Sequence, residues 1–186
     1  VRGGTGAKIE SITNTTQSNG SHTVGTKDVN ITYYGKESGG CVAAGTLITM
    51  ADGSTKKVEN IVAGDQVLVF NHETGQFDVS SVIFNEADQL TTYTIINLEF
   101  SNGSIVKVIY EHGFFDLDLM QYVYITESNY MDFIGHRFSS LEQINGLFIA
   151  EEAVLVNAYL TQEYTRVYSP VTVHHLNYYT ENMLSM

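Results

Sequence analysis

The sequence of 186 residues contains no tryptophan, one proline, one cysteine and few basic side chains. A single cysteine, Cys41, excludes an internal disulfide and a zinc site built from several cysteines. Nine Lys and Arg stand against 21 Asp and Glu, and the net charge of −12 repels phosphate backbones. Nucleic acid is therefore not an expected partner. No apolar run is long enough to cross a bilayer and no signal-peptide pattern opens the chain, so no membrane partner is expected.

The composition that remains predicts one globular domain with a polar segment in front of it. A hydrophobic content of 43% is enough for one substantial core. Residues 1–40 are rich in Gly, Ser, Thr and Asn and end in Ser38-Gly39-Gly40, which predicts a flanking linker or tail before a domain at 41–186. Within this segment, the run from Val29 to Tyr34 resembles a strand and could pair onto the main sheet.

The domain is predicted to be all-β. Thr92 to Phe100 and Ser104 to Tyr110 are β-type runs on either side of Asn102-Gly103, which predicts a hairpin with a type I′ turn. The 12 Tyr and nine Phe favour strands over helices. Further strands are expected at Leu47 to Met50, Gln66 to Phe70, Gln121 to Thr126, Ala153 to Leu160 and Thr165 to His174.

Cys41 stands at the boundary between the polar segment and the domain. Its thiol could attack the carbonyl carbon of Gly40, which no side chain shields, and form a thioester. A thiol with an ordinary pKa of about 8.5 needs a neighbouring base or a positive environment for this reaction. The other interpretation is a small buried apolar side chain, and the spacing alone favours that one.

Four segments resemble, in the same order, the sequence blocks of Hint domains, the self-cleaving modules of inteins and Hedgehog proteins. Those domains also begin with a cysteine. In the second block a histidine follows a strand, and His112 is the residue that matches it here. The resemblance covers about residues 41–186 and rests on Cys41 to Gly53, Val58 to Leu68, Gly103 to Phe115, and Val167 to Val173 with Asn177-Tyr178-Tyr179.

The resemblance implies a flat, horseshoe-shaped all-β fold with pseudo-two-fold symmetry that brings both ends of the domain to one site. It implies an N–S acyl shift at the Gly40–Cys41 peptide, with Cys41 as nucleophile and His112 as the general acid that protonates the departing amide nitrogen. No cofactor and no metal are expected. The substrate is the chain's own segment 1–40, and water or an external nucleophile resolves the thioester.

The sequence also departs from the family pattern. Ile109 occupies the position three residues before the histidine where a threonine is usual, and Gly113 follows the histidine where a proline is often found. Ser169 and Asn177 stand where an aspartate and a histidine are frequent. The matching hydrogen-bonding groups must therefore come from other residues.

His174 and His175 are the nearest replacements in the sequence. On a strand, alternation would turn them to opposite faces, so that one of the two could face the site. His175 is the candidate for a third catalytic residue. The alternative is that both lie at a solvated strand end.

Two further features limit the predicted chemistry. The sequence closes with Leu184-Ser185-Met186 in place of the terminal Asn that cyclises in splicing inteins, so N-terminal cleavage is expected and splicing is not. Asp116, Asp118 and Asp132 are interpreted as a solvated acidic stretch, with no metal bound. His136, which has apolar neighbours, is interpreted as structural.

A second hypothesis keeps the fold and drops the reaction. The chain would then be a catalytically silent Hint-like module that serves as a structural or binding unit of a larger protein. A third option, a cysteine hydrolase acting on other substrates, would need a separate cleft, of which the sequence gives no sign. The sequence fixes no compartment, and the context it suits is a secreted or surface bacterial multidomain protein.

Overall fold

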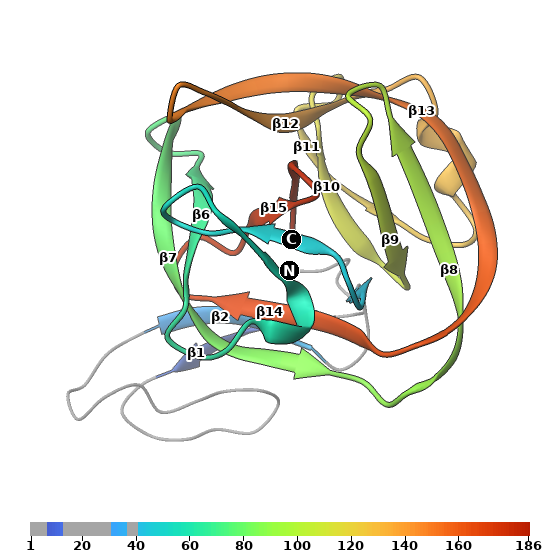
Figure 1. The fold of residues 1–186 in the computed structure, drawn as a ribbon, viewed down its shortest axis with the longest axis horizontal. Helices are drawn as coiled ribbons and strands as arrows, with labels where there is room; N and C mark the ends of the chain where they lie inside the picture. The colour runs from blue at the N-terminus through green and yellow to red at the C-terminus, as the bar shows by residue number, and fades with distance from the viewer. Residues whose placement is uncertain (1–6, 13–30, 37–40) are drawn as a thin grey trace.

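The computed structural model describes residues 7–12, 31–36 and 41–186, the last range with its side chains (Figure 1). In this part of the chain the only helices are two short 3₁₀ segments, η1 (Val58–Asn60) and η2 (Tyr130–Phe133). The strands from Cys41 onward are β3 (Cys41–Ala43), β4 (Leu47–Thr49), β5 (Thr55–Lys57), β6 (Gln66–Asn71), β7 (Gln76–Ala87), β8 (Thr91–Phe100), β9 (Ile105–Ile109), β10 (His112–Asp116), β11 (Gln121–Ile125), β12 (Arg137–Ile144), β13 (Leu147–Thr165), β14 (Val167–Thr172), β15 (Tyr178–Thr180) and β16 (Met183–Ser185).

One antiparallel sheet contains all strands from β3 to β16. Its order is β5-β4-β15-β16-β10-β12-β13-β8-β9-β3-β14-β7-β6, and β11 pairs with β10 beside this path. Figure 1 shows the long strands β7, β8 and β13 curving around the rim, with the shorter strands between them. The predicted all-β, horseshoe-shaped fold is therefore confirmed.

The curled sheet encloses its own core. Alternating side chains of β8 and β9 point inward, and Ile96, Leu98 and Val108 are fully buried. Aromatic rings close the core on the β10–β12 side, where Phe100, Phe114 and Phe138 pack edge to face. This packing fixes the positions of β9 and β10, the two strands that carry the candidate site.

The β8–β9 hairpin forms where predicted, but with a different turn. Gly103 has a φ of 88° and Asn102 does not have a positive φ. The amide of Phe100 donates to the carbonyl oxygen of Ser104 at 2.9 Å, which leaves a three-residue loop ending in a left-handed glycine. The predicted type I′ turn is wrong because Asn102 Oδ1 accepts the Ser104 amide at 3.0 Å, a local bond that competes with that turn.

The strand predicted in the flanking segment pairs with a neighbour and not with the main sheet. Strand β2 (Ile31–Lys36) is antiparallel to β1 (Ala7–Ile12) in a separate two-stranded sheet that lies next to β14 (Figure 1). In the main sheet, β14 pairs with β7 from Tyr168 to Thr172 and with β3 at Val167 and Tyr168. Residues 29–30 of the predicted strand and Ser38-Gly39-Gly40 lie outside the described residues.

Among the described residues, no helix is of the length and hydropathy that a bilayer crossing requires.

Candidate functional site

Cys41 lies on a strand that is paired on both sides. Its Cα is the register partner of Ile109 in β9, and the next residue, Val42, pairs with Tyr168 in β14. The Cys41 side chain is 3% exposed and packs in a small apolar cluster with Tyr93 and Ile109. The first residue of the predicted domain is therefore held inside the sheet.

The antiparallel register also fixes what flanks the amino end of Cys41. In β9, the residue after Ile109 on the side of the amino end of Cys41 is Tyr110. In β14, the residue after Tyr168 on that side is Ser169, whose side chain is buried. Tyr110 and Ser169 are thus on the side from which the upstream peptide joins Cys41.

A two-residue corner connects the neighbour of Cys41 to His112. Strand β9 ends at Ile109 and β10 begins at His112, and Tyr110 in the corner has a left-handed φ of 56°. His112 is fully buried, with its ring edge-on to that of Phe114 at a centroid distance of 5.2 Å. Cys41 is therefore paired with a residue three positions before His112, and the two predicted catalytic residues belong to the same end of the β9–β10 unit.

Met186, the last residue of the sequence, pairs with the residue that follows His112. The Gly113 amide donates to the Met186 carbonyl oxygen at 3.1 Å, and the Met186 amide donates to the Gly113 carbonyl oxygen at 3.0 Å. A Cβ atom at position 113 would lie 3.0 Å from Met186 Cγ and 3.1 Å from Tyr124 Cε1. Glycine fits here because it supplies the amide hydrogen that proline lacks and leaves room for Met186.

Two phenols surround the thiol in an acidic neighbourhood. Burial raises the pKa of Tyr93, and the negative charges of Asp88, Tyr110 and the Cys41 thiolate add to this effect. Burial likewise raises the pKa of Tyr110, again with contributions from Asp88 and the Cys41 thiolate. Both phenols consequently stay protonated at neutral pH and can donate hydrogen bonds.

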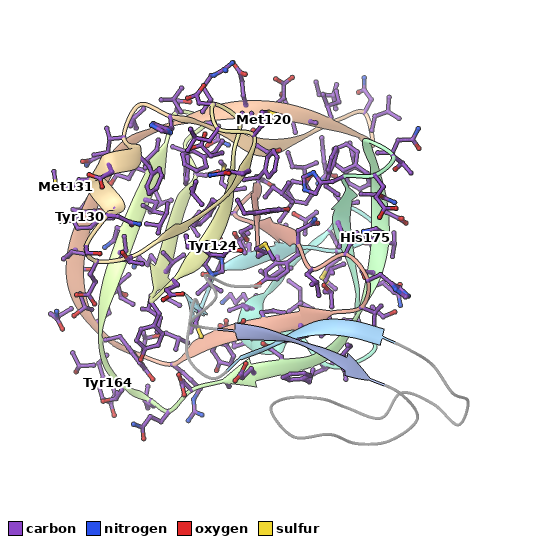
Figure 2. The ribbon with its side chains drawn as sticks, turned by 180° about the vertical axis from the view of Figure 1, so that it is seen from behind. Met120, Tyr124, Tyr130, Met131, Tyr164 and His175 are labelled. Atoms are coloured by element: carbon purple, nitrogen blue, oxygen red, sulfur yellow. The ribbon has the colours of Figure 1, made fainter. Side chains whose placement is uncertain are left out.

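His175 lies in a turn and not on a strand, so the expected alternation of His174 and His175 is wrong. Strand β14 ends at Thr172, whose hydroxyl donates to the His175 carbonyl oxygen at 2.7 Å, and His174 has a φ of 62°. His175 Nε2 lies 3.5 Å from Asp78 Oδ2 on β7. Figure 2 accordingly shows His175 at the side of the molecule formed by β6 and β7.

The pocket beside His175 nevertheless connects it to the end of the chain. It is also lined by Asn177 and Met186, and Met186 pairs with the residue after His112. Asn177 has a structural role. Its Oδ1 accepts the Phe70 amide hydrogen at 2.8 Å, and its Nδ2 donates to the Phe70 carbonyl oxygen at 2.9 Å. The residue at the position where the family often has histidine therefore hydrogen-bonds to β6.

The acidic stretch is not uniformly solvated, because Asp116 is fully buried in β10. One of its carboxylate oxygens accepts the amides of Asp118 and Leu119, and the other lies 2.6 Å from His136 Nδ1. Asp118 in turn accepts the Nε hydrogen of Arg137 at 2.8 Å. The potential ligand atoms of Asp116, Asp118 and His136 lie within 4.8 Å of one another, but their carboxylates are engaged by protein donors.

Tyr110 was not predicted as a site residue, although it lies within the segment that resembles the second block. The only local signal is its place two residues before His112. Its left-handed backbone and its position beside Cys41 become visible only once β3 is paired with β9.

Comparison with solved structures identifies the fold. A bacterial intein-like domain from Clostridium thermocellum superposes with a TM-score of 0.61 and 21% identity, covering 78% of this chain and 96% of that one. The Ssp DnaB mini-intein variant M86 gives a TM-score of 0.63 at 15% identity, with 80% and 95% covered. The TvoVMA intein gives 0.63 at 17%, with 79% and 96% covered.

No protein-family model matches the sequence, and no curated protein does. The likeness is therefore one of structure, and it extends over nearly the whole length of each of these inteins and intein-like domains. The described chain has the Hint fold of inteins and bacterial intein-like domains.

Proposed function

We propose that this domain cleaves its own chain at the Gly40–Cys41 peptide through an N–S acyl shift. The observation that carries the proposal is the pairing of Cys41 with Ile109, three residues before the buried His112. A reaction at the first residue of a domain needs its nucleophile and its acid on strands that are fixed relative to each other, and the sheet supplies this positioning. Gly40 lies outside the described residues.

The reaction proceeds in two steps. The Cys41 sulfur attacks the carbonyl carbon of Gly40, a C–S bond forms and the C–N bond breaks, with the thiol proton lost to a base. His112 delivers a proton to the departing nitrogen, which becomes the free amino group of Cys41. Water then adds to the thioester, releasing residues 1–40 with a carboxylate end and restoring the thiol.

A small hollow beside β14 supports hydrolysis as the second step of the proposed reaction. A hollow of about 20 Å³ lies between Ser169, Thr172 and Met186, which is enough for one water molecule. Ser169 is on the side of β14 that faces the amino end of Cys41. Hydrolysis is therefore the outcome that this arrangement supports in the absence of an external nucleophile.

A catalytically silent Hint-like module is the second candidate, and Ile109 is the observation in its favour. Ile109 is 1% exposed and packs with Cys41 in one apolar cluster. The Ile109 side chain cannot donate a hydrogen bond next to Cys41, as is expected of a domain that has lost its activity.

Intact-mass spectrometry of the full chain separates these two functions. We expect dithiothreitol or hydroxylamine to release residues 1–40 from the unsubstituted protein and not from Cys41→Ala. His112→Ala should slow the release by roughly 10²- to 10⁴-fold, as for the loss of a positioned acid. His72→Gln, at an exposed turn position, is the matched histidine control. An unchanged mass of the unsubstituted protein under every condition would contradict self-cleavage and support the silent module.

A further inference from the structure

The proposed site lacks a hydrogen-bond donor at the position of Ile109. The buried isoleucine side chain next to Cys41 cannot donate a hydrogen bond. During the acyl shift, negative charge develops on the carbonyl oxygen of the scissile peptide, and a donor aimed at that oxygen typically contributes more than any other single group. The following inference rests on the proposed self-cleavage and asks which residue supplies that donor.

The backbone of Tyr110 is strained in a way that packing does not explain. A left-handed φ of 56° is unusual for a bulky residue, and such conformations gather at functional sites. The residue is only partly buried, with 44% of its surface exposed, so full enclosure of the ring does not enforce this backbone. The corner therefore holds the phenol partly open to solvent at the start of β10.

The register places Tyr110 on the correct side of the nucleophile. Strands β3 and β9 are antiparallel, with Cys41 opposite Ile109. Tyr110, the next residue along β9, therefore lies toward the amino end of Cys41, where the peptide bond to be cleaved begins. Ile109, in contrast, faces the apolar cluster behind the sulfur.

The phenol of Tyr110 is electrostatically coupled to the sulfur. Burial is the main cause of the raised pKa of Tyr110, and the negative charges of Asp88, the Cys41 thiolate and Glu127 add to it. Tyr93 is coupled to the same thiolate, but its hydroxyl already donates to the Gln89 carbonyl oxygen at 2.7 Å. Among the described residues none holds the Tyr110 hydroxyl by a hydrogen bond. Tyr110 is thus the phenol whose proton is available.

We propose that the Tyr110 hydroxyl is the oxyanion donor of this site, donating its hydrogen bond to the carbonyl oxygen of the peptide that Cys41 attacks. It takes the place of the hydroxyl that Ile109 does not provide. The ring reaches the substrate from the corner between β9 and β10, and His112 follows on the far side of the same corner. One short connection thus carries both the oxyanion donor and the general acid.

The test compares cleavage rates of full-length Tyr110→Phe and Tyr164→Phe. Tyr164 is 70% exposed on β13 and is labelled at the edge of the molecule in Figure 2, so it controls for the loss of a phenol. We expect Tyr110→Phe to lower the rate of thiol-induced cleavage by about 10²- to 10³-fold, as for loss of one oxyanion donor, without changing its dependence on thiol concentration. Tyr164→Phe should cleave at the unsubstituted rate.

A second measurement examines the phenol directly in a chain that does not cleave. In Cys41→Ala labelled with ¹³C at tyrosine Cζ, Tyr110 should titrate at lower pH than in the unsubstituted protein, because the thiolate charge is gone while Asp88 and Glu127 remain. An unaltered titration, or equal cleavage rates of Tyr110→Phe and Tyr164→Phe, would overturn the role of Tyr110 and leave self-cleavage standing. Absence of cleavage in the unsubstituted chain would overturn self-cleavage itself, and this role with it.

Discussion

At the scale of single residues, the environment of Cys41 decides how fast the proposed reaction can run. The sulfur is backed by Ile109 and Tyr93 and has the acidic side chain of Asp88 in its neighbourhood. Ile109 cannot donate a hydrogen bond beside the sulfur, so the cleavage rate should respond to a donor that is added there.

Ile109→Thr is expected to raise the cleavage rate about tenfold, because a hydroxyl then stands next to the nucleophile in addition to Tyr110. The same change removes buried apolar atoms from a side chain that is 1% exposed, so it should lower the free energy of unfolding by about 1–3 kcal/mol. Intact-mass kinetics and urea denaturation measure the two effects. Ile109→Val keeps the apolar character and serves as control; an equal gain in its cleavage rate would contradict the explanation.

Asp65, in the Gly64-Asp65 pair that resembles the family pattern, has a structural role in its turn. In the Gly64-Asp65 turn, its carboxylate accepts hydrogen bonds from Lys56 Nζ at 2.7 Å and from the Val62 amide at 3.0 Å. The hydrogen bond from Lys56 is the main cause that lowers its pKa, followed by the one from Val62. The folded state therefore favours the charged form, and its contribution to stability is present above the ordinary Asp pKa of about 3.9 and lost as the pH falls below it.

Asp65→Asn should accordingly lower the free energy of unfolding by about 1 kcal/mol at pH 7 and by less near pH 3. Urea denaturation at both values measures the difference. Asp132→Asn, at an exposed position of η2, is the control for the loss of an acidic side chain. A constant deficit for Asp65→Asn between pH 7 and pH 3 would refute the assignment.

At the scale of elements, β10 joins the candidate site to the rest of the sheet. It begins with His112, pairs with β11 along its length, and meets Met186 through Gly113. Its last residue, Asp116, is tied to His136 before β12. Changes at either end of this strand should therefore be felt by His112.

Gly113→Pro would remove the amide that donates to Met186 and place ring atoms where a Cβ already meets Met186 and Tyr124. A proline inside a paired strand costs about 3 kcal/mol or more. We expect a loss of stability of this size and faster hydrogen exchange at Met186. Gly113→Ala keeps the amide hydrogen and should lose less; equal losses in the two variants would assign the effect to crowding alone.

Asp116→Ala would leave the amides of Asp118 and Leu119 without their acceptor inside the fold. Because Asp116 is fully buried, the expected loss is about 2–4 kcal/mol in urea denaturation. Asp118→Ala removes a solvent-screened ion pair with Arg137 and should cost clearly less stability than Asp116→Ala. A loss at Asp116 no greater than that at Asp118 would show that the Asp116–His136 pair does not anchor β10.

The elements themselves were largely predictable from the sequence. Thr92 to Phe100 is rich in β-branched and aromatic residues and forms β8 within one residue of the predicted start. Turn type was not predictable, because the bond from the Ser104 amide to Asn102 decides it locally. The strand expected through His174 ends at Thr172, where a side-chain bond to the backbone begins a turn that no periodicity announces.

For the site, the identity of Cys41 and His112 came from the resemblance, and their roles remain predictions. Tyr110 could not be found in this way. Its importance follows from the pairing of β3 with β9, and the register between distant strands depends on the whole core and not on local sequence.

At the scale of the whole molecule, strands distant in sequence lie side by side. Strand β3 is inserted between β9 and β14, and β4 pairs with β15 near the other end of the chain. Such pairings must wait until long loops close. The sheet can therefore be complete only after most of the chain has collapsed.

Refolding of Cys41→Ala from urea, followed by tyrosine fluorescence, should consequently be slow, with time constants on the order of seconds, as for other sheets built from non-local pairs. Thr49→Pro, in the short strand β4, would test whether the β4–β15 pairing limits the rate. If the substituted chain refolds as fast as Cys41→Ala alone while being less stable, that pairing forms after the rate-limiting step.

The placement of β3 between two neighbours has a consequence for the direction of the proposed chemistry. The amine and the thioester that the shift produces are both on Cys41, which β3 holds between β9 and β14, so the amine can take the acyl group back. The acyl shift is then a reversible exchange between nitrogen and sulfur. The fraction of chain that is released measures the rate at which a nucleophile attacks the thioester relative to the rate of the reverse shift to nitrogen.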